Sequence, residues 1–349
     1  MRFSALGDVA MLSPVVREYA LQHTEDSVTV LSVPFCAPLF EDIAPNVSFL
    51  GRDVKTQYRG VTGLYRLFKE LHAMHFDRIV DAHDVLRTKV LRQFFRLRGY
   101  EVRVIDKHRS ERRRLTAEPG KKVLRQLPTS FENYAEAMGV PGFPADPADP
   151  ADPDIPGFPV APDIPDTPVS PVSPVSPGGG LIGVAPFAAH AGKIYPVEKM
   201  EKVVELLSHS GRVVLFGGKG KEEDIMRAWA QKYNNVELAR DVISGGALAA
   251  ELELMRGLDV MLSMDSANMH LASLVGTRVV SVWGATHPYA GFLGWGQRME
   301  DCVQKDLPCR PCSIYGSNPC RYGDFRCLNS ITPEEIVRAV LSVIKELRS

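Results

Sequence analysis

Prolines recur at every third position from Pro141 to Pro177 in this chain of 349 residues. Thirteen of the chain's 26 prolines stand in these 37 residues. Because proline lacks the backbone N–H and fixes φ, neither a helix nor a paired strand can include the repeat. We therefore predict a proline-rich linker over residues 141–180. It leaves about 140 residues before it and about 170 after it, lengths that suit two ordinary domains.

The composition excludes several classes of protein. Hydrophobic residues make up 45% and charged residues 24% of the chain, which are globular rather than disordered values. No apolar run approaches the roughly 18–20 residues of a membrane span. The N-terminus lacks a charged head followed by an apolar stretch, which argues against a signal peptide. A cytoplasmic location is therefore expected.

Strand-like and helix-like segments alternate on both sides of the linker. The expected strands cover residues 28–32, 76–82, 102–105, 181–186, 212–216, 236–239, 260–263 and 279–283. The expected helices cover residues 9–21, 64–74, 85–97, 197–208, 221–233, 248–256, 268–274 and 332–347. This rhythm predicts an α/β protein of two doubly wound, Rossmann-like domains, residues 1–140 and 181–349. In such folds ligands bind at the carboxyl ends of the strands.

The polar residues in the loops after strands are the candidates for catalysis and ligand binding. Asp8 opens a helical run and could be a general base, or a plain helix cap. Lys193 follows the strand 181–186 and suits a phosphate, or it is a solvated loop lysine. The loop after 260–263 opens a helix whose N–H groups could hold a diphosphate, or it is a capped helix with an incidental histidine. That loop carries Asp265, Ser266, Ala267 and His270.

A basic stretch runs from Arg87 to Arg125, with 14 Lys or Arg against four acids, and it includes Arg112, Arg113 and Arg114. It is either a solvated face or a site for an anionic partner such as a phosphorylated acceptor, an anionic bilayer or nucleic acid. Few aromatic residues interrupt the stretch, which counts against stacking on nucleic acid.

Five of the six cysteines crowd into residues 302–327. The spacing Cys309-x2-Cys312-x7-Cys320-x6-Cys327 could close a tetrahedral, structural zinc site. The alternative is a set of free thiols packed in an irregular loop.

Several of these segments together resemble the signatures of glycosyltransferase family 9, the ADP-heptose:lipopolysaccharide heptosyltransferases. The segments are Phe3–Asp8 (FSALGD), Lys193–Pro196 (KIYP), and Asp265-Ser266 with His270-Leu271-Ala272. The resemblance implies a GT-B architecture, two Rossmann-like domains facing a cleft, with the acceptor on the first and the sugar nucleotide on the second. It implies metal-independent inversion without a cofactor, ADP-heptose as donor, and a lipid-linked glycan acceptor at the inner membrane. Nucleic acid is not an expected partner.

The resemblance also assigns roles to individual residues. Asp8 matches the catalytic base, and Lys193 matches the phosphate-binding lysine. The segment that holds the donor's heptose and diphosphate matches Asp265, Ser266, Ala267 and His270. Glu222 or Glu223 falls near the acid that contacts the ribose, and Thr286 lies in the loop near the nucleotide. Independently of the resemblance, we expect the basic stretch with Arg112, Arg113 and Arg114 to hold the acceptor.

The chain departs from the family pattern at three places. Ala267 stands where the family usually has glycine, and His287 where aspartate is common. The family also has an apolar strand just before the first motif, whereas Met1 stands almost on that motif. We expect a start further upstream, or else an N-terminal sheet without its central strand. The alternative functions are a GT-B enzyme with another nucleotide sugar and a non-catalytic relative.

Overall fold

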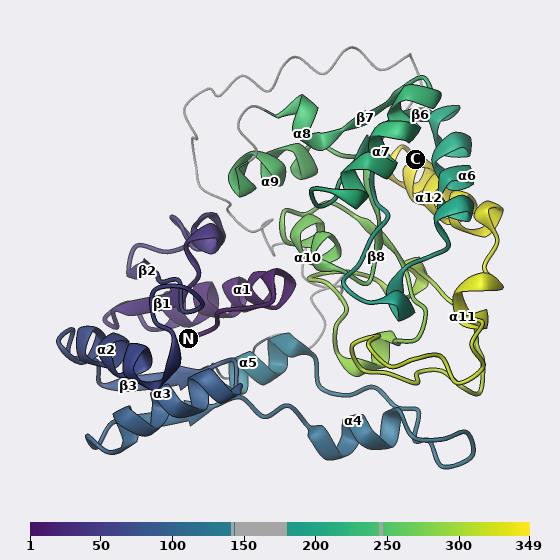
Figure 1. Cartoon of the computed structure of the whole chain (residues 1–349). Helices are drawn as coiled ribbons and strands as arrows, with labels where there is room; N and C mark the ends of the chain where they lie inside the picture. Colours follow the sequence, from purple (N-terminus) through teal and green to yellow (C-terminus); the bar gives the residue numbers. More distant parts are fainter. Residues whose placement is uncertain (141–142, 144–179, 244–246) are drawn as a thin grey trace. The chain divides into compact units, whose positions relative to one another are not determined.

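The computed structural model describes residues 1–140, 143, 180–243 and 247–349 (Figure 1). Apart from residues 143 and 180, the expected linker lies outside the described residues. The chain forms two compact units. The described residues of the first unit are 1–107, 128–140 and 143, and those of the second are 108–127, 180–243 and 247–349. Residues 108–127, which the sequence assigned to the N-terminal domain, group with the second unit.

The first unit contains four strands in two parallel pairs, β1 with β2 and β3 with β4. The expected elements of this unit are present within a few residues, and β2, α5 and the 3-10 helix η1 are additional. In chain order the elements are α1 (Leu6–Gln22), β1 (Val28–Ser32), η1 (Pro34–Leu39), β2 (Val47–Gly51), α2 (Gly60–His72), β3 (Arg78–Asp81), α3 (Leu86–Arg96), β4 (Glu101–Val104) and α5 (Ser130–Met138).

Apolar spacing explains how the first unit packs. In α2 the side chains of Leu64, Leu67, Phe68 and Leu71 are all buried, which is the i, i+3, i+4, i+7 stripe of an amphipathic helix. Leu67, Phe68 and Leu71 of this stripe pack with side chains of α3 and of the strands into one core, and α2 and α3 lie side by side (Figure 1). Elsewhere in the first unit, α1 packs against α5.

The second unit is built on one parallel sheet of six strands in the order β10-β9-β8-β5-β6-β7. All of the strands and helices expected in this unit are present. In chain order the elements are α4 (Arg109–Leu115), β5 (Gly180–Ala185), η2 (Ala191–Lys193), α6 (Val197–Ser208), β6 (Gly211–Leu215), α7 (Lys221–Lys232), β7 (Val236–Leu238), α8 (Ala239–Val242), α9 (Leu248–Arg256), β8 (Val260–Met264), α10 (Ala267–Leu274), β9 (Val279–Val282), η3 (Pro288–Ala290), η4 (Met299–Asp301), β10 (Cys302–Val303), α11 (Arg326–Asn329) and α12 (Pro333–Leu347).

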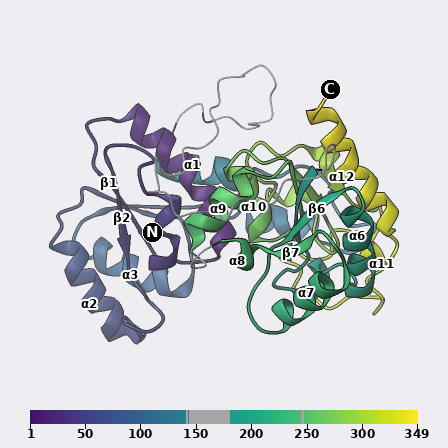
Figure 2. The same ribbon diagram turned by 90° about the horizontal axis from the view of Figure 1, so that it is seen from above.

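The sheet of the second unit is covered on both faces. Figure 2 shows α6 and α12 on one side of it and α9 and α10 on the other. Every residue of β8 and β9 is buried, as expected for central strands of a parallel sheet. The predicted cap of α12 is also confirmed, because the Thr332 hydroxyl accepts the N–H of Glu335. Within the described residues, no helix combines the length and hydropathy that a membrane crossing requires.

Candidate functional site

Four neighbouring strands of the second unit carry predicted residues in the loops at their carboxyl ends. Across the sheet these strands are β9, β8, β5 and β6. Thr286, Asp265 and Lys193 lie in the segments after the first three, and Glu222 lies in the first turn of α7, after β6. The strand order runs outward from the middle pair, with β5, β6 and β7 on one side and β8, β9 and β10 on the other. The pair β5 and β8 is therefore the switch point at which open α/β sheets bind ligands.

Lys193 and Asp265 meet at this switch point. The Nζ atom of Lys193 lies 2.9 Å from Oδ2 of Asp265, and the two side chains are 14% and 3% exposed. A carboxylate buried this deeply needs a charged or hydrogen-bonding partner. Lys193 is therefore a fixed part of the site rather than a solvated loop lysine.

Contacts made by glycines fix the position of Lys193. Gly316 has φ +76°, and a Cβ there would stand 2.6 Å from Cγ of Lys193, so the stem of the lysine lies directly against this glycine. The N–H of Gly192 donates to the carbonyl of Gly316 at 3.2 Å, and the N–H of Ala285 donates to that of Gly192 at 2.8 Å. The loop after β5 is thus tied to the loop after β9 and to the cysteine-rich segment.

The structure distinguishes the two acids that follow β6. Oε2 of Glu222 accepts the N–H of Gly218 at 2.7 Å, so this carboxylate lies on the glycine-rich loop. Glu223 instead forms ion pairs with Arg227 and Arg240. Glu222 is therefore the acid of this pair that faces the loop at the strand end.

The loop after β9 is held by an arginine that the sequence did not single out. Thr286 is fully buried, and its Oγ1 has no hydrogen-bond partner within the described part of the chain. Arg310 is 4% exposed and donates to the carbonyls of Gly284 and Thr286, the latter from Nη2 at 2.9 Å. Burial lowers the pKa of this guanidinium. A lone arginine in an irregular loop has no periodic signal, which is why sequence reasoning missed it.

The helix α10 begins directly after Asp265. Oγ of Ser266 lies 3.2 Å from Oγ of Ser263, and among the described residues no side chain caps the helix. Ala267 is the first helical residue, and His270, which is 7% exposed, follows less than one turn later. The first backbone N–H groups of α10 are consequently available to an anion.

In the first unit, Asp8 lies in the first turn of α1. Its carboxylate accepts the N–H of Ala5 at 3.2 Å and pairs with the guanidinium of Arg2 at 2.7 Å. The Arg2 side chain is 8% exposed, whereas that of Asp8 is 28% exposed. Asp8 is therefore not the N-cap that the plain alternative made it, because Ala5 holds that position and Asp8 is the third residue of the helix. Its carboxylate bonds back to the N–H of the cap residue and stays accessible.

His83 also contacts the segment that leads to Asp8, and sequence reasoning missed it. Its Nδ1 accepts the N–H of Phe3 at 3.4 Å, and its Nε2 lies 3.3 Å from Oγ of Ser4. Burial, with the charges of Arg2 and Lys107 adding to it, lowers the pKa of His83 to about 4. The ring is therefore neutral at pH 7. His83 directly follows the segment predicted as strand 76–82, so the rule of polar residues after strands could have found it.

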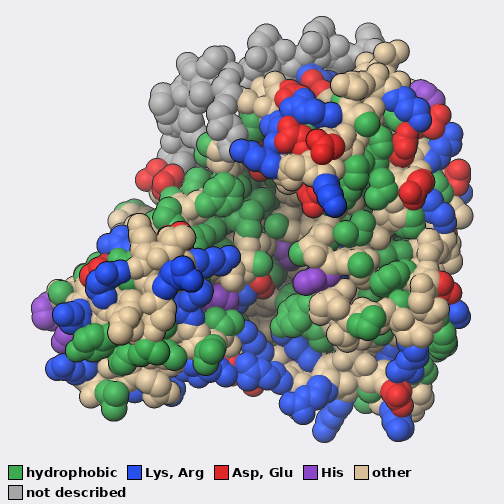
Figure 3. Space-filling view, in the orientation of Figure 1, with side chains coloured by type: hydrophobic (Ala, Val, Ile, Leu, Met, Phe, Trp, Pro, Cys, Tyr) green, Lys and Arg blue, Asp and Glu red, His purple; other side chains and the backbone are tan. Residues whose placement is uncertain are grey.

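The three predicted acceptor arginines lie on α4 and differ in their surroundings. Arg112 is half-buried: its guanidinium lies 5.0 Å from the ring centroid of Phe292, and Nη1 donates to the hydroxyl of Tyr315 at 2.9 Å. Arg113 and Arg114 are exposed. The space-filling view shows Lys and Arg side chains gathered over α4 (Figure 3). Arg112 thus attaches α4 to the second unit, and the other two present charge to solvent.

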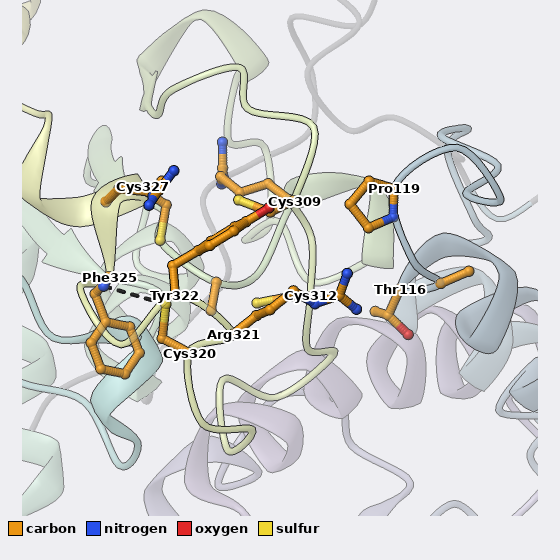
Figure 4. Close-up of a pocket in the computed structure, with 13 residues that line it drawn as sticks. Thr116, Pro119, Cys309, Cys312, Cys320, Arg321, Tyr322, Phe325 and Cys327 are labelled. Atoms are coloured by element: carbon orange, nitrogen blue, oxygen red, sulfur yellow. Dashed lines mark hydrogen bonds between the residues drawn. The ribbon is translucent and has the colours of Figure 1, made fainter.

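Four cysteines line a small cavity of about 50 Å³ (Figure 4). They are Cys309, Cys312, Cys320 and Cys327. Burial raises the pKa of Cys327 to about 11 and also raises that of Cys312, whose neighbouring thiols add to the effect. Among the described residues, no group of three or more His, Cys, Asp or Glu side chains is arranged to hold a metal ion. All four thiols are free, and the zinc site stays a prediction.

Comparisons with known proteins place these residues in context. Residues 170–320 match the model of Glycosyltransferase family 9 (heptosyltransferase). The chain is 21% identical over 168 residues to lipooligosaccharide heptosyltransferase 2 of Campylobacter jejuni. The aligned residues make up 47% of this chain and 51% of that protein. The chain thus spans about half the length of the curated relatives it matches.

Two solved structures are similar over almost the whole chain. The glycosyl transferase family 9 structure from Veillonella parvula has 16% identity and a TM-score of 0.71, covering 99% of this chain and 96% of that one. The E. coli ADP-heptose lps heptosyltransferase II has 17% identity and a TM-score of 0.64, with both chains covered completely. These likenesses confirm the predicted fold class. The resemblance that the sequence motifs indicated is also confirmed, since residues 170–320 match the model of this family.

Proposed function

We propose that this chain is an inverting glycosyltransferase that moves heptose from ADP-heptose to a hydroxyl of a lipopolysaccharide core or related glycan. The observation that carries the proposal is the buried Lys193–Asp265 pair at the sheet's switch point, inside the residues that match the family model. The name of the E. coli neighbour supports the choice of donor and acceptor.

The second unit offers groups for each part of the donor. The ammonium of Lys193 and the N-terminal N–H groups of α10, beside Ser266, are suited to the diphosphate. Asp265 can accept sugar hydroxyls with the oxygen that is not paired to Lys193, and Glu222 can accept ribose hydroxyls from the glycine-rich loop. The diphosphate leaves with two bond electrons, so cations fixed beside it lower the barrier most as the bond breaks.

Asp8 would act as the base in the first unit. Its accessible carboxylate takes the proton of the acceptor hydroxyl while that oxygen attacks the anomeric carbon opposite the leaving ADP, which inverts the configuration. Arg2 fixes the orientation of the carboxylate through their 2.7 Å contact. In this scheme Lys193 and the start of α10 supply the positive charge that a metal ion supplies in other transferases. The reaction would then proceed without a metal.

The exposed guanidinium groups of Arg113 and Arg114 are suited to a phosphorylated or carboxylate-bearing lipid acceptor. Such an acceptor lies in an anionic membrane surface, which would attract the same basic helix. Replacing both arginines by glutamine should raise the KM for the acceptor and leave the KM for the donor unchanged.

A mass-spectrometric transfer assay with ADP-heptose and a panel of lipid acceptors tests the proposal, with and without EDTA. Asp8→Asn should lower kcat by about 10²–10⁴-fold, and Glu41→Gln, at an exposed acid of the same unit, should not change it. Full transfer by Asp8→Asn would refute the base, and loss of transfer in EDTA would refute metal independence.

The two alternative functions predict other outcomes in a parallel binding experiment. Thermal shifts with a panel of nucleotide sugars should favour ADP-heptose. A larger shift with another sugar nucleotide would indicate a different donor, and no shift with any of them would indicate a non-catalytic relative.

A further inference from the structure

A histidine and a serine of the first unit meet on the segment that leads to Asp8. His83 is 7% exposed, and its Nδ1 lies 3.4 Å from the backbone nitrogen of Phe3. At the other end of the ring, Nε2 lies 3.3 Å from Oγ of Ser4. Among the described residues, the hydroxyl of Ser4 has no other hydrogen-bond partner. The mechanism proposed above uses neither of these two side chains.

The contact with Phe3 determines which ring nitrogen of His83 carries the proton. A backbone N–H can only donate, so Nδ1 must present a lone pair to Phe3. Burial, with the charges of Arg2 and Lys107 adding to it, lowers the pKa of the ring to about 4. The ring is therefore neutral at pH 7 and carries a single N–H. That proton is on Nε2, which donates to the oxygen of Ser4.

A hydroxyl that accepts a hydrogen bond from a histidine keeps its own proton for another partner. The O–H of Ser4 cannot point back at the ring, because Nε2 already supplies the proton of that contact. Ser4 is partly exposed, so its proton can reach a ligand. Hydrogen bonds in a chain also polarise one another, which makes this O–H a stronger donor. Ser4 thus presents a directed hydrogen-bond donor rather than a freely rotating hydroxyl.

A buried carboxylate fixes the loop that holds His83. Asp81 is fully buried at the end of β3, and its Oδ1 accepts the N–H groups of His83 and Asp84, each at 3.0 Å. Its Oδ2 pairs with the guanidinium of Arg92 on α3 at 2.9 Å. A buried carboxylate with all of these partners holds them in one arrangement. The end of β3 and α3 therefore fix the direction from which the histidine ring reaches Ser4.

Ser4 lies on the same short segment as the groups that orient Asp8. The N–H of the next residue, Ala5, donates to Oδ2 of Asp8 at 3.2 Å. Arg2 pairs with the same oxygen at 2.7 Å, and its Nη1 donates to the carbonyl of Ala82, in the loop after β3, at 2.7 Å. One set of contacts thus holds both the hydroxyl of Ser4 and the carboxylate of Asp8.

We propose that Ser4 binds the acceptor of the transfer by donating a hydrogen bond to an oxygen beside the reacting hydroxyl, and that His83 is the positioning residue that directs this donor. The inference rests on the proposed function, in which Asp8 takes the proton of the reacting hydroxyl. An ionised carboxylate can only accept hydrogen bonds, whereas sugar oxygens both donate and accept. The O–H of Ser4 supplies the donor that Asp8 lacks.

Nitrogen-15 NMR of the histidine rings tests the position of the proton in the full chain without substrate. The signals of His83 are identified by their absence in His83→Gln. They should show a protonated Nε2 and an unprotonated Nδ1, and the ring should still be neutral at about pH 5, between its pKa of about 4 and the ordinary value of 6.5. A proton on Nδ1, or a ring that is charged at pH 6, would overturn the inference.

Transfer kinetics test the hydroxyl. Ser4→Ala should raise the KM for the acceptor by about 3–10-fold, as expected for the loss of one neutral hydrogen bond, and leave the KM for ADP-heptose unchanged. Ser4→Thr keeps a hydroxyl and should restore the KM for the acceptor. The matched control is Ser48→Ala, at an exposed serine of β2, which should change neither constant.

The possible failures can be told apart. An unchanged acceptor KM in a Ser4→Ala chain that still transfers heptose would overturn this inference and leave the proposed function standing. Equal rises in both KM values would also overturn it, because they would indicate a general disturbance of the fold. No transfer by the unsubstituted chain would instead refute the proposed function, and this role of Ser4 with it.

Discussion

Replacing Lys193 by methionine tests the electrostatic centre of the second unit. Methionine keeps an unbranched stem against Gly316 and removes the charge, so Asp265 stays 3% exposed without its ammonium partner. Removing one member of a buried ion pair costs about 3–5 kcal/mol, because the remaining charge is left without compensation. Since Lys193 is 14% exposed and water reaches its end of the pair, we expect the free energy of unfolding to fall by about 3 kcal/mol.

Tryptophan fluorescence in urea measures this loss in the correct unit. All three tryptophans of the chain, Trp229, Trp283 and Trp295, belong to the second unit. The control is Lys202→Met, which breaks a pair with Glu205 whose side chains are 46% and 31% exposed, and it should cost less than about 1 kcal/mol.

A double variant separates charge from packing. Lys193→Met combined with Asp265→Asn removes both charges, and the double variant should therefore be more stable than the sum of the two single losses by about 1–3 kcal/mol. The reasoning is wrong if Lys193→Met costs no more than the exposed control. It is also wrong if the two single losses simply add, because the buried carboxylate would then not depend on the lysine.

Three further changes test other parts of the second unit. Gly316→Ala should weaken ADP binding measured by calorimetry, because its Cβ would displace the stem of the site lysine, whereas Gly323→Ala has a similar φ of +74° and open space and should not. Burial, with the charge of a nearby arginine, lowers the pKa of His287 to about 4 from 6.5, so the unfolded chain binds a proton in this window that the folded chain does not. Stability should therefore fall as the pH drops from about 6.5 to about 4, and less steeply in His287→Asn, whose amide oxygen can still accept the N–H of Tyr289. Thr332→Ala removes the cap of α12 and should cost about 1 kcal/mol in the urea measurement.

Periodicity predicted the strands that are buried at every residue and the helices that bury one apolar stripe. Strand β8 is buried at every residue, and α12 combines an apolar stripe with a capping box, so each has a strong local pattern. Strand β2 was missed because most of its residues are only half-buried and its pattern is weak. Helix α5 could have been found, because Thr129 and Glu132 form a capping box and Gly139 ends the helix at φ +79°.

In the candidate site, too, some residues could be predicted from the sequence and others could not. A parallel sheet brings the carboxyl ends of its strands to one edge, so residues that directly follow strands could be predicted to lie together, as Lys193 and Asp265 do. The supports of the site could not be predicted. Gly316 and Arg310 act from an irregular loop, and their contacts depend on a backbone path for which the sequence has no periodic signal.

The segment 108–127 shows why local patterns cannot assign a segment to a core. Its run of arginines is typical of a solvated face or an anion site, and its position in the chain suggested the N-terminal domain. The structure instead buries Leu115 and Leu127 with the second unit, where the N–H of Leu127 donates to the carbonyl of Tyr289. The burial of these two apolar side chains decides where the segment packs, because arginine heads can stay in water while apolar side chains cannot. Any acceptor bound by Arg113 and Arg114 would consequently be held by the unit that carries the donor residues.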